Sequence, residues 1–416
     1  MSLSLLDVLI AGAGPAGVAT ALALVQRSPS LAGRIVCLDR ARFPRAKPCG
    51  GGLTGHAHQA LRRLGLAVRV PSVACRTGRL VYGQAAADVV LERPVEIVRR
   101  DDFDADLVAQ ARARGIEIVE GEGIESFAVD AGARTVSVTT SRGRALRARV
   151  LVGADGAGSR VRKALAAALP VVGADTSTVP LRLFRSEIPA PPALQLGERM
   201  IYDFSPMDHG LRGYVWLFPV AGDRVNVGVM HYPSRHLPGG EIERLLHRTL
   251  AGHGVHLASS ARGWPAWRYD PRARIAGPHL ICVGDAAGID PLTGEGIAVG
   301  LEQGIVAADA IVHALESDDF RLAGYAAAVR AAVVGRELAL DRWAAALLYP
   351  PSGFSLALSM VMFDPTVRAL YAARVSGSAV LADAKPDLLR ALARHTLAAR
   401  HRVRRLAAAA RADTTL

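Results

Sequence analysis

The chain has 416 residues and a mass of 43.8 kDa; half of its residues are hydrophobic and 21% are charged. This composition excludes a disordered or fibrous protein, and the length allows two or three packed units. The four cysteines are scattered and form no CxxC pair, so neither a disulfide framework nor a structural zinc site is expected. A cytoplasmic protein fits best. No metal site is predicted, since His56 and His58, two residues apart, face different sides of an expected helix.

The formal net charge of +12 raises the question of nucleic acid or membrane partners. Only three of the 50 basic residues are lysine, and the chain is rich in alanine, arginine and glycine, as a G+C-rich genome would make it. No nucleic-acid partner is therefore predicted. Residues 390–411 contain seven arginines and no acid, which is typical of a solvated helix face but also of a helix on an anionic membrane.

A second segment bears on membrane contact. Residues 343–363 carry no charge and are long enough to cross a bilayer. Pro350, Pro351 and Gly353 would break a spanning helix, so two short apolar helices joined by a turn are expected. Such helices pack in a core, line a pocket or dip into a membrane surface, and peripheral membrane contact stays open.

The first motif lies between an apolar run typical of a buried parallel strand, residues 7–11, and an alanine-rich stretch expected to be a helix. In this context GxGxxG binds a dinucleotide, because the loop and the helix N-terminus face a pyrophosphate. The second strand ends at Asp39, whose carboxylate is expected to bind both hydroxyls of an adenosine ribose, with Arg40 beside it. The predicted contacts of the glycine loop are Gly12, Gly14, Pro15, Ala16 and Gly17.

Two further glycine-rich strand ends decide between NAD and FAD. Residues 153–156 (GADG) and 284–288 (GDAAG) each follow an apolar strand, and three such ends suit an extended FAD better than one nicotinamide. Asp285 is expected to hold the ribityl chain or pyrophosphate, and Arg100 to pair with a phosphate. A turn before a long helix is expected to present its amides to the flavin ring. The remaining predicted contacts are Asp155, Gly156, Arg160, Gly284, Pro291, Gly294, Glu295, Gly296 and Ile297.

The elements GxGxxG, Arg-x-x-Phe-Asp, GADG and GDAAG…P..GEGI, in this order, resemble the flavoprotein superfamily that includes p-hydroxybenzoate hydroxylase. The resemblance covers roughly residues 5–315. It implies an α/β fold with a Rossmann-like FAD-binding domain, an interleaved antiparallel β-sheet substrate domain, and C-terminal helices. The predicted boundaries are 1–74, 95–165 and 272–335 for the FAD-binding domain, 75–94 and 166–271 for the substrate domain, and 336–416 for the C-terminal helical region.

Two more motifs resemble those of the geranylgeranyl reductase family, which saturates double bonds of polyprenyl chains with reduced FAD. The residues that match its CGG loop and its Tyr-x-Trp-x-Phe-Pro strand are Cys49, Gly50, Gly51, Tyr214, Trp216, Phe218 and Pro219. The resemblance implies that the strand lines a substrate cavity beside the flavin and that the loop lies on the isoalloxazine side. It implies a prenyl lipid or quinone substrate, and the GGGLT form of the loop favours a menaquinone tail.

The chemistry is consistent with this assignment. Reduction of an isolated alkene needs a hydride from the flavin, a proton for the other carbon, and an apolar trough for the chain. Trp216 and Phe218 supply apolar surface, and Tyr214 is a candidate to orient a polar group. Cys49 is a candidate proton donor, or else packs beside the ring. The alternating aromatic residues are also typical of any half-buried strand, so a structural role stays open.

The alternative from another reaction class is an FAD-dependent monooxygenase that hydroxylates an aromatic or polyketide compound. Such enzymes commonly carry GDAAH where this chain has Gly288. Flavin halogenases resemble the chain less, since Tyr214 and Phe218 depart from their Trp-x-Trp-x-Ile-Pro strand. A non-catalytic flavin-binding or lipid-carrier protein is a third hypothesis. Because no separate nicotinamide-binding GxGxxG is found, the electron donor is expected to be transiently bound NAD(P)H or a ferredoxin.

Overall fold

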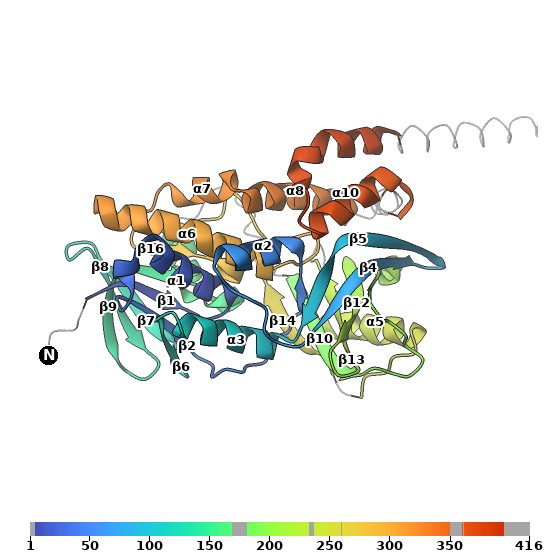
Figure 1. Ribbon diagram of the computed structural model, residues 1–416, viewed down its shortest axis with the longest axis horizontal. Helices are drawn as coiled ribbons and strands as arrows, with labels where there is room; N and C mark the ends of the chain where they lie inside the picture. The colour runs from blue at the N-terminus through green and yellow to red at the C-terminus, as the bar shows by residue number, and fades with distance from the viewer. Residues whose placement is uncertain are drawn as a thin grey trace, which may run out of the picture.

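The computed structural model describes residues 5–168, 181–232, 237–258, 260–349, 360 and 362–394. Two eight-stranded sheets lie toward opposite ends of an elongated molecule (Figure 1). Helices run along one side of both sheets and connect them (Figure 1). The α/β class predicted from the sequence is confirmed, with C-terminal helices following the second sheet. The predicted domain boundaries stay a prediction.

The first sheet contains β1 (Leu5–Ala11), β2 (Ile35–Asp39), β6 (Glu117–Glu120), β7 (Ile124–Asp130), β8 (Thr135–Thr140), β9 (Ala145–Gly153), β15 (Ala276–Gly277) and β16 (Leu280–Cys282). Its strand order is β15-β16-β9-β1-β2-β6, with β7 and β8 attached to β9. The central strands β1, β2, β9 and β16 pair in parallel. Their carboxyl ends, which carry the glycine motifs, therefore meet at one edge of the sheet.

The helices packed on this sheet are α1 (Pro15–Arg27), α2 (Gly55–Arg63), α3 (Arg100–Arg112), α4 (Arg160–Ala168), α6 (Ile297–Ser317) and α7 (Tyr325–Ala331). Short 3₁₀ helices are η1 (Pro29–Leu31), η2 (Gly156–Gly158), η3 (Ser205–His209), η4 (Gly284–Ala286) and η5 (Leu381–Ala384). Among the described residues, α6 alone is long and apolar enough to cross a membrane, but 67% of its apolar window is buried inside the protein, as in a core helix.

Helix α3 begins at Arg100, the first residue of the Arg-x-x-Phe-Asp motif. Asp101 and Asp102 occupy its first turn, where negative charge is favourable to the helix dipole. Arg100 and Asp104 form an i, i+4 ion pair in the same turn. The Arg-x-x-Phe-Asp motif is thus a helix start.

The second sheet contains β3 (Gly52–Leu53), β4 (Ser72–Tyr82), β5 (Ala85–Val98), β10 (Leu181–Pro189), β11 (Arg199–Asp203), β12 (Gly213–Val220), β13 (Arg224–His231) and β14 (Arg262–Ala266). Its order is β14-β10-β13-β12-β11-β4-β5-β3, and only β4 and β11 pair in parallel among these neighbours. The predicted alternation in β12 gives the sheet two different faces. Val215 and Leu217 pack against α5 (Gly239–Gly252). The aromatic residues that alternate with them, Tyr214, Trp216 and Phe218, face the other way.

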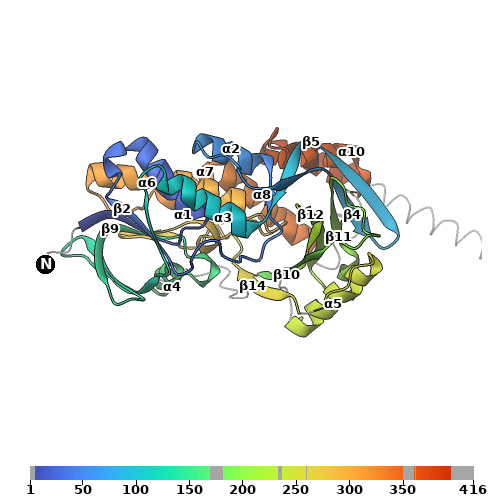
Figure 2. The same ribbon diagram turned by 60° about the horizontal axis from the view of Figure 1, so that its bottom comes forward.

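The C-terminal region adds α8 (Val333–Leu348) and α10 (Pro365–Val375). Figure 2 shows α5 and α10 on opposite sides of the second sheet. Asp364 caps α10 by accepting hydrogen bonds from the first backbone amides of the helix. Residues 350–359 of the expected apolar helix pair, and residues 395–411 of the arginine-rich run, lie outside the described residues.

Candidate active site

A cavity of about 670 Å³ lies between the carboxyl ends of the parallel strands and the aromatic face of the second sheet. Ala11, Asp39, Ala154 and Gly284 line it from the ends of four strands of the first sheet. The position fits the general rule that α/β proteins bind ligands at the carboxyl ends of parallel strands. Helix α10 contributes a further part of the wall, which no sequence motif indicated.

The glycine loop after β1 is built for close approach. Gly12 has a φ of +105°, and a side chain there would collide with the carbonyl group of Ala154. A side chain at Gly17 would likewise collide with the carbonyl oxygen of Gly12. Glycine at this position therefore lets α1 begin directly against the strand. Asp39 fixes the loop, because its Oδ2 accepts a hydrogen bond from the amide of Ala13 at 2.9 Å. The N-terminus of α1 therefore opens onto the cavity.

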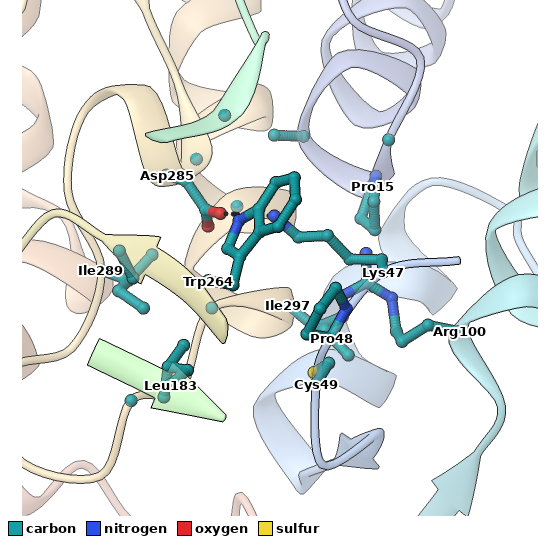
Figure 3. A pocket seen from close by; sticks show the side chains of 18 of the residues that line it. Pro15, Lys47, Pro48, Cys49, Arg100, Leu183, Trp264, Asp285, Ile289 and Ile297 are labelled. Atoms are coloured by element: carbon teal, nitrogen blue, oxygen red, sulfur yellow. Dashed lines mark hydrogen bonds and ion pairs between the residues drawn. The ribbon is translucent and has the colours of Figure 1, made fainter. Parts of the chain in front are cut away.

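Lys47, which sequence reasoning missed, points across the cavity toward Asp285 (Figure 3). Its Nζ lies 3.0 Å from Asp285 Oδ2 and 4.6 Å from the centroid of the Trp264 ring. Burial raises the pKa of the Asp285 carboxyl, but the positive charges of Lys47, Arg100 and Arg45 lower it by more. The pKa of Asp285 is therefore below its usual value. Lysine is rare in this chain, and this rarity is the signal that could have drawn attention to Lys47.

Cys49 lies beside a buried arginine (Figure 3). The Nε and Nη2 atoms of Arg100 donate to the two carboxylate oxygens of Asp104 at 2.8 Å, and Arg45 is 3.0 Å from the same carboxylate. Burial lowers the pKa of Arg100, while Asp104 and the neighbouring Cys49 raise it by more. The Cys49 sulfur also accepts a hydrogen bond from the Gly51 amide at 3.4 Å. A fixed positive charge thus stands next to the sulfur atom.

One buried side chain connects the cysteine loop to the aromatic strand. Asn226, only 1% exposed, lies on β13 opposite Phe218. Its Nδ2 donates to the carbonyl oxygens of Cys49 at 2.7 Å and Gly50 at 3.2 Å, while its Oδ1 accepts from Trp216 Nε1 at 3.0 Å. Sequence reasoning missed this residue, although it is the only asparagine in the chain. The two motifs are therefore parts of one hydrogen-bonded unit.

The turn at residues 291–296 is held from two sides. Tyr214 donates its hydroxyl hydrogen to the Thr293 carbonyl at 2.5 Å. Asp290 accepts from the amide of Thr293 at 3.0 Å and so shapes the turn from within. Glu295 accepts from the Thr54 hydroxyl at 2.5 Å, which links the turn to the start of α2. Tyr214 thus uses its hydroxyl to position the turn.

The family of FAD binding domains matches residues 5–336. The chain belongs to this FAD-binding family. A protein of Mycolicibacterium smegmatis named menaquinone reductase is 30% identical over 326 residues, which cover 73% of this chain and 75% of the relative. A digeranylgeranylglycerophospholipid reductase of Methanopyrus kandleri is 26% identical over 327 residues, covering 75% of this chain and 78% of the relative. The predicted resemblance is confirmed.

A solved structure supports the fold over nearly the whole length. It is a geranylgeranyl bacteriochlorophyll reductase-like protein from Thermoplasma acidophilum, with a TM-score of 0.71 and 19% identity. The similarity covers 91% of this chain and 98% of that protein. The FAD-binding family model ends at residue 336, so α10, which reaches the cavity, lies outside the matched FAD domain.

The residues around the cavity fit FAD. The α1 N-terminus and the cations Arg45 and Lys47 suit a pyrophosphate, and the Asp39 carboxylate suits a ribose. Asp155 carries a buried Oδ1 atom without a hydrogen-bond partner among the described residues. Burial raises the pKa of this carboxyl more than its hydrogen bonds with Ser159 and the Arg160 amide lower it. An orphaned acceptor at the cavity wall is consistent with a ligand that donates to it.

Most of the predicted site residues line this one cavity. They include the residues of the CGG loop, the three aromatic residues of β12, Arg40, Arg160 and Ile297. Those that do not line it are Gly17, Pro219 and Pro291. Gly17 acts instead through its contact with the loop backbone. Among the described residues, no group of three or more histidine, cysteine or acidic side chains is placed to hold a metal ion.

Proposed function

We propose that the protein is an FAD-dependent oxidoreductase that reduces C=C bonds of a polyprenyl chain carried by a lipid or a quinone. The names of the relatives support this substrate class. The observation that carries the proposal is the unit formed by Cys49, Asn226 and Trp216, which joins an apolar aromatic wall to the loop at the FAD cavity.

When bound and reduced, FAD supplies a hydride to one carbon of the double bond. The chain's own residues then have two tasks. Trp216 and Phe218, whose ring centroids are 6.4 Å apart, present an apolar surface on which a prenyl unit packs with exclusion of water. Cys49 is the proposed proton donor to the other carbon, since its sulfur lines the cavity and Arg100 stands beside it.

The monooxygenase alternative receives no support at residue 288. Gly288 has a φ of +111°, and a Cβ there would lie 2.8 Å from the carbonyl oxygen of Arg268. A histidine, which such enzymes commonly carry at this point, would therefore require the backbone to move. The GDAAG form of this motif therefore fits the backbone at this position.

The electron donor is proposed to be NAD(P)H, bound transiently, or a ferredoxin. We further propose that a cytoplasmic protein takes its substrate from the membrane surface by peripheral contact, because a prenyl chain partitions into lipid. Arginine-rich residues 390–411 are the candidate contact. If removal of residues 395–416 left binding to anionic vesicles at low salt unchanged, this part of the proposal would be wrong.

Product analysis tests the proposed reaction. The FAD-loaded protein is kept reduced with excess dithionite under argon and mixed with menaquinone or a geranylgeranyl lipid. Products are exposed to air before mass spectrometry, because a reduced quinone ring returns to the quinone whereas a saturated tail keeps its added hydrogens. A gain of two hydrogen atoms per reduced bond is expected. An unchanged lipid, with flavin that reacts only once oxygen and an aromatic compound are supplied, would favour the monooxygenase.

A further inference from the structure

The hydroxyl groups of Tyr202 and Tyr371, at the cavity, have no oxygen or nitrogen partner among the residues that the structure describes. Tyr214 and Tyr349 donate their hydroxyl hydrogens to backbone carbonyls of the turn at residues 291–296. Tyr202 makes only a weak contact, at 3.7 Å, with the sulfur of Met200. Tyr371 forms no hydrogen bond with any described residue. Both unused phenols line the cavity, so their hydroxyl groups are free to bind a ligand that enters it.

The two phenols come from different parts of the chain. Tyr202 lies on β11, and its ring packs edge-on against Tyr214 and Phe218 at centroid distances of 5.4 and 5.1 Å. Tyr371 comes from α10, outside the matched FAD-binding domain. Burial raises the pKa of Tyr202 well above its usual value and helps to raise that of Tyr371 to about 12. Both groups therefore remain protonated donors at physiological pH.

The charges near Tyr371 select against a phosphate. Arg374, one helical turn further along α10, is 2.5 Å from Asp341 and 2.8 Å from Glu337, both of which are buried. Asp290 and Glu295 add negative charge on the side of the turn, since both raise the pKa of Tyr371. Arg374 is already paired with Asp341 and Glu337, and Asp290 and Glu295 also act on it, so carboxylates outnumber the guanidinium here. An anionic headgroup would be repelled here, whereas a neutral oxygen acceptor would not.

We propose that Tyr202 and Tyr371 donate hydrogen bonds to an uncharged oxygen acceptor at the polar end of the prenyl substrate, of the kind a quinone carbonyl provides. This inference rests on the proposed function and narrows it to a prenylated quinone in preference to a prenylated phospholipid. The two tyrosines are then specificity residues for the substrate, one on β11 and one on α10.

The test compares two substrates and three variants of the FAD-loaded protein. The substrates are menaquinone and a digeranylgeranyl glycerophospholipid, and tail saturation is measured by mass. Tyr202→Phe and Tyr371→Phe each remove only a hydroxyl group. Tyr325→Phe is the matched control, because its hydroxyl donates to the Cys282 carbonyl in the FAD-domain core. A second readout is the infrared carbonyl band of bound ¹³C-labelled menaquinone, which a hydrogen bond shifts to lower frequency.

The wild type is expected to prefer menaquinone. Each cavity variant should raise the KM for menaquinone by about 2- to 10-fold, as loss of one hydrogen bond does, with little change in kcat. The carbonyl band should shift back in these variants but not in the Tyr325→Phe control. An unchanged KM and band, or a preference for the phospholipid, would overturn the inference while leaving the proposed function intact. Saturation of neither substrate would overturn the proposed function instead, and the carbonyl band would still decide whether the tyrosines bind the quinone.

Discussion

Replacement of Asn226 by leucine should separate the stability of the protein from the placement of its cysteine loop. The leucine side chain has a similar size to that of asparagine but cannot form hydrogen bonds. The substitution removes three hydrogen bonds at once, two to the carbonyls of Cys49 and Gly50 and one from Trp216. The indole N–H and both carbonyls would lose their partners in a region where Asn226 is 1% exposed and Trp216 is 4% exposed.

The expected magnitudes follow from this count. Each bond contributes about 0.5–1.5 kcal/mol net, so the free energy of unfolding should fall by about 1.5–4.5 kcal/mol. The loop would no longer be held against Trp216, and a displacement of about 1 Å at a reacting centre can cost on the order of 100-fold in rate. Single-turnover tail saturation should therefore slow by about that factor. FAD binding should change less, because the glycine loop and Asp39 are held by other contacts.

A matched control exists in the chain. Gln110 is also buried, and its amide makes three hydrogen bonds, two with the backbone of Ala67 and one with Asp106, away from the cavity. Gln110→Leu should lose similar stability in denaturant unfolding, yet retain the wild-type rate of tail saturation. If Asn226→Leu saturated the tail as fast as Gln110→Leu, the argument that Asn226 positions the loop would be refuted.

The remaining predictions concern three other side chains. Trp216→Ala should keep FAD bound, as seen in the flavin spectrum, but slow tail saturation strongly; loss of FAD would show that the aromatic strand is structural. Cys49→Ala should slow tail saturation strongly, because the second carbon would then take its proton from a less well placed donor; an unaltered rate would assign the proton to another group. Burial lowers the pKa of His231 from 6.5 to about 4, assisted by Arg182 and Arg212. As pH falls, His231 therefore takes up its proton in the unfolded chain before it does so in the folded protein, and this favours unfolding. Between pH 6.5 and 4, the unfolding free energy of the wild type should drop by about 3 kcal/mol more than that of His231→Asn. Denaturant titrations at several pH values measure this difference. If the unfolding free energies of the two proteins fell in parallel with pH, His231 would not be the cause.

The sequence predicted those parts of the site that are local in the chain. The glycine loop at Gly12 and the turn at residues 291–296 are short motifs whose structure follows from strand, loop and helix signals. The faces of β12 also followed from its alternation, with Trp216 toward the cavity as expected.

The parts that were missed depend on contacts between distant residues. Lys47 and Asp285 are 238 positions apart, and Asn226 reaches Cys49 across 177 positions. Tyr371 lies on a helix without any motif, so only tertiary structure brings it to the cavity. Composition still held a signal, because one asparagine and three lysines in 416 residues are conspicuous where a G+C-rich genome disfavours them.

The most direct measurement of the central claim is the coupling of flavin oxidation to alkene saturation. The reduced, FAD-loaded protein is mixed without oxygen with a geranylgeranyl lipid that has no quinone ring, and flavin absorbance is followed in a stopped-flow instrument while quenched samples are analysed by mass. Flavin oxidation and tail saturation should proceed at the same rate, with one double bond saturated per flavin oxidised. A flavin that stays fully reduced until oxygen is admitted, both with this lipid and with menaquinol, whose ring is already reduced, would contradict the assignment as a prenyl reductase.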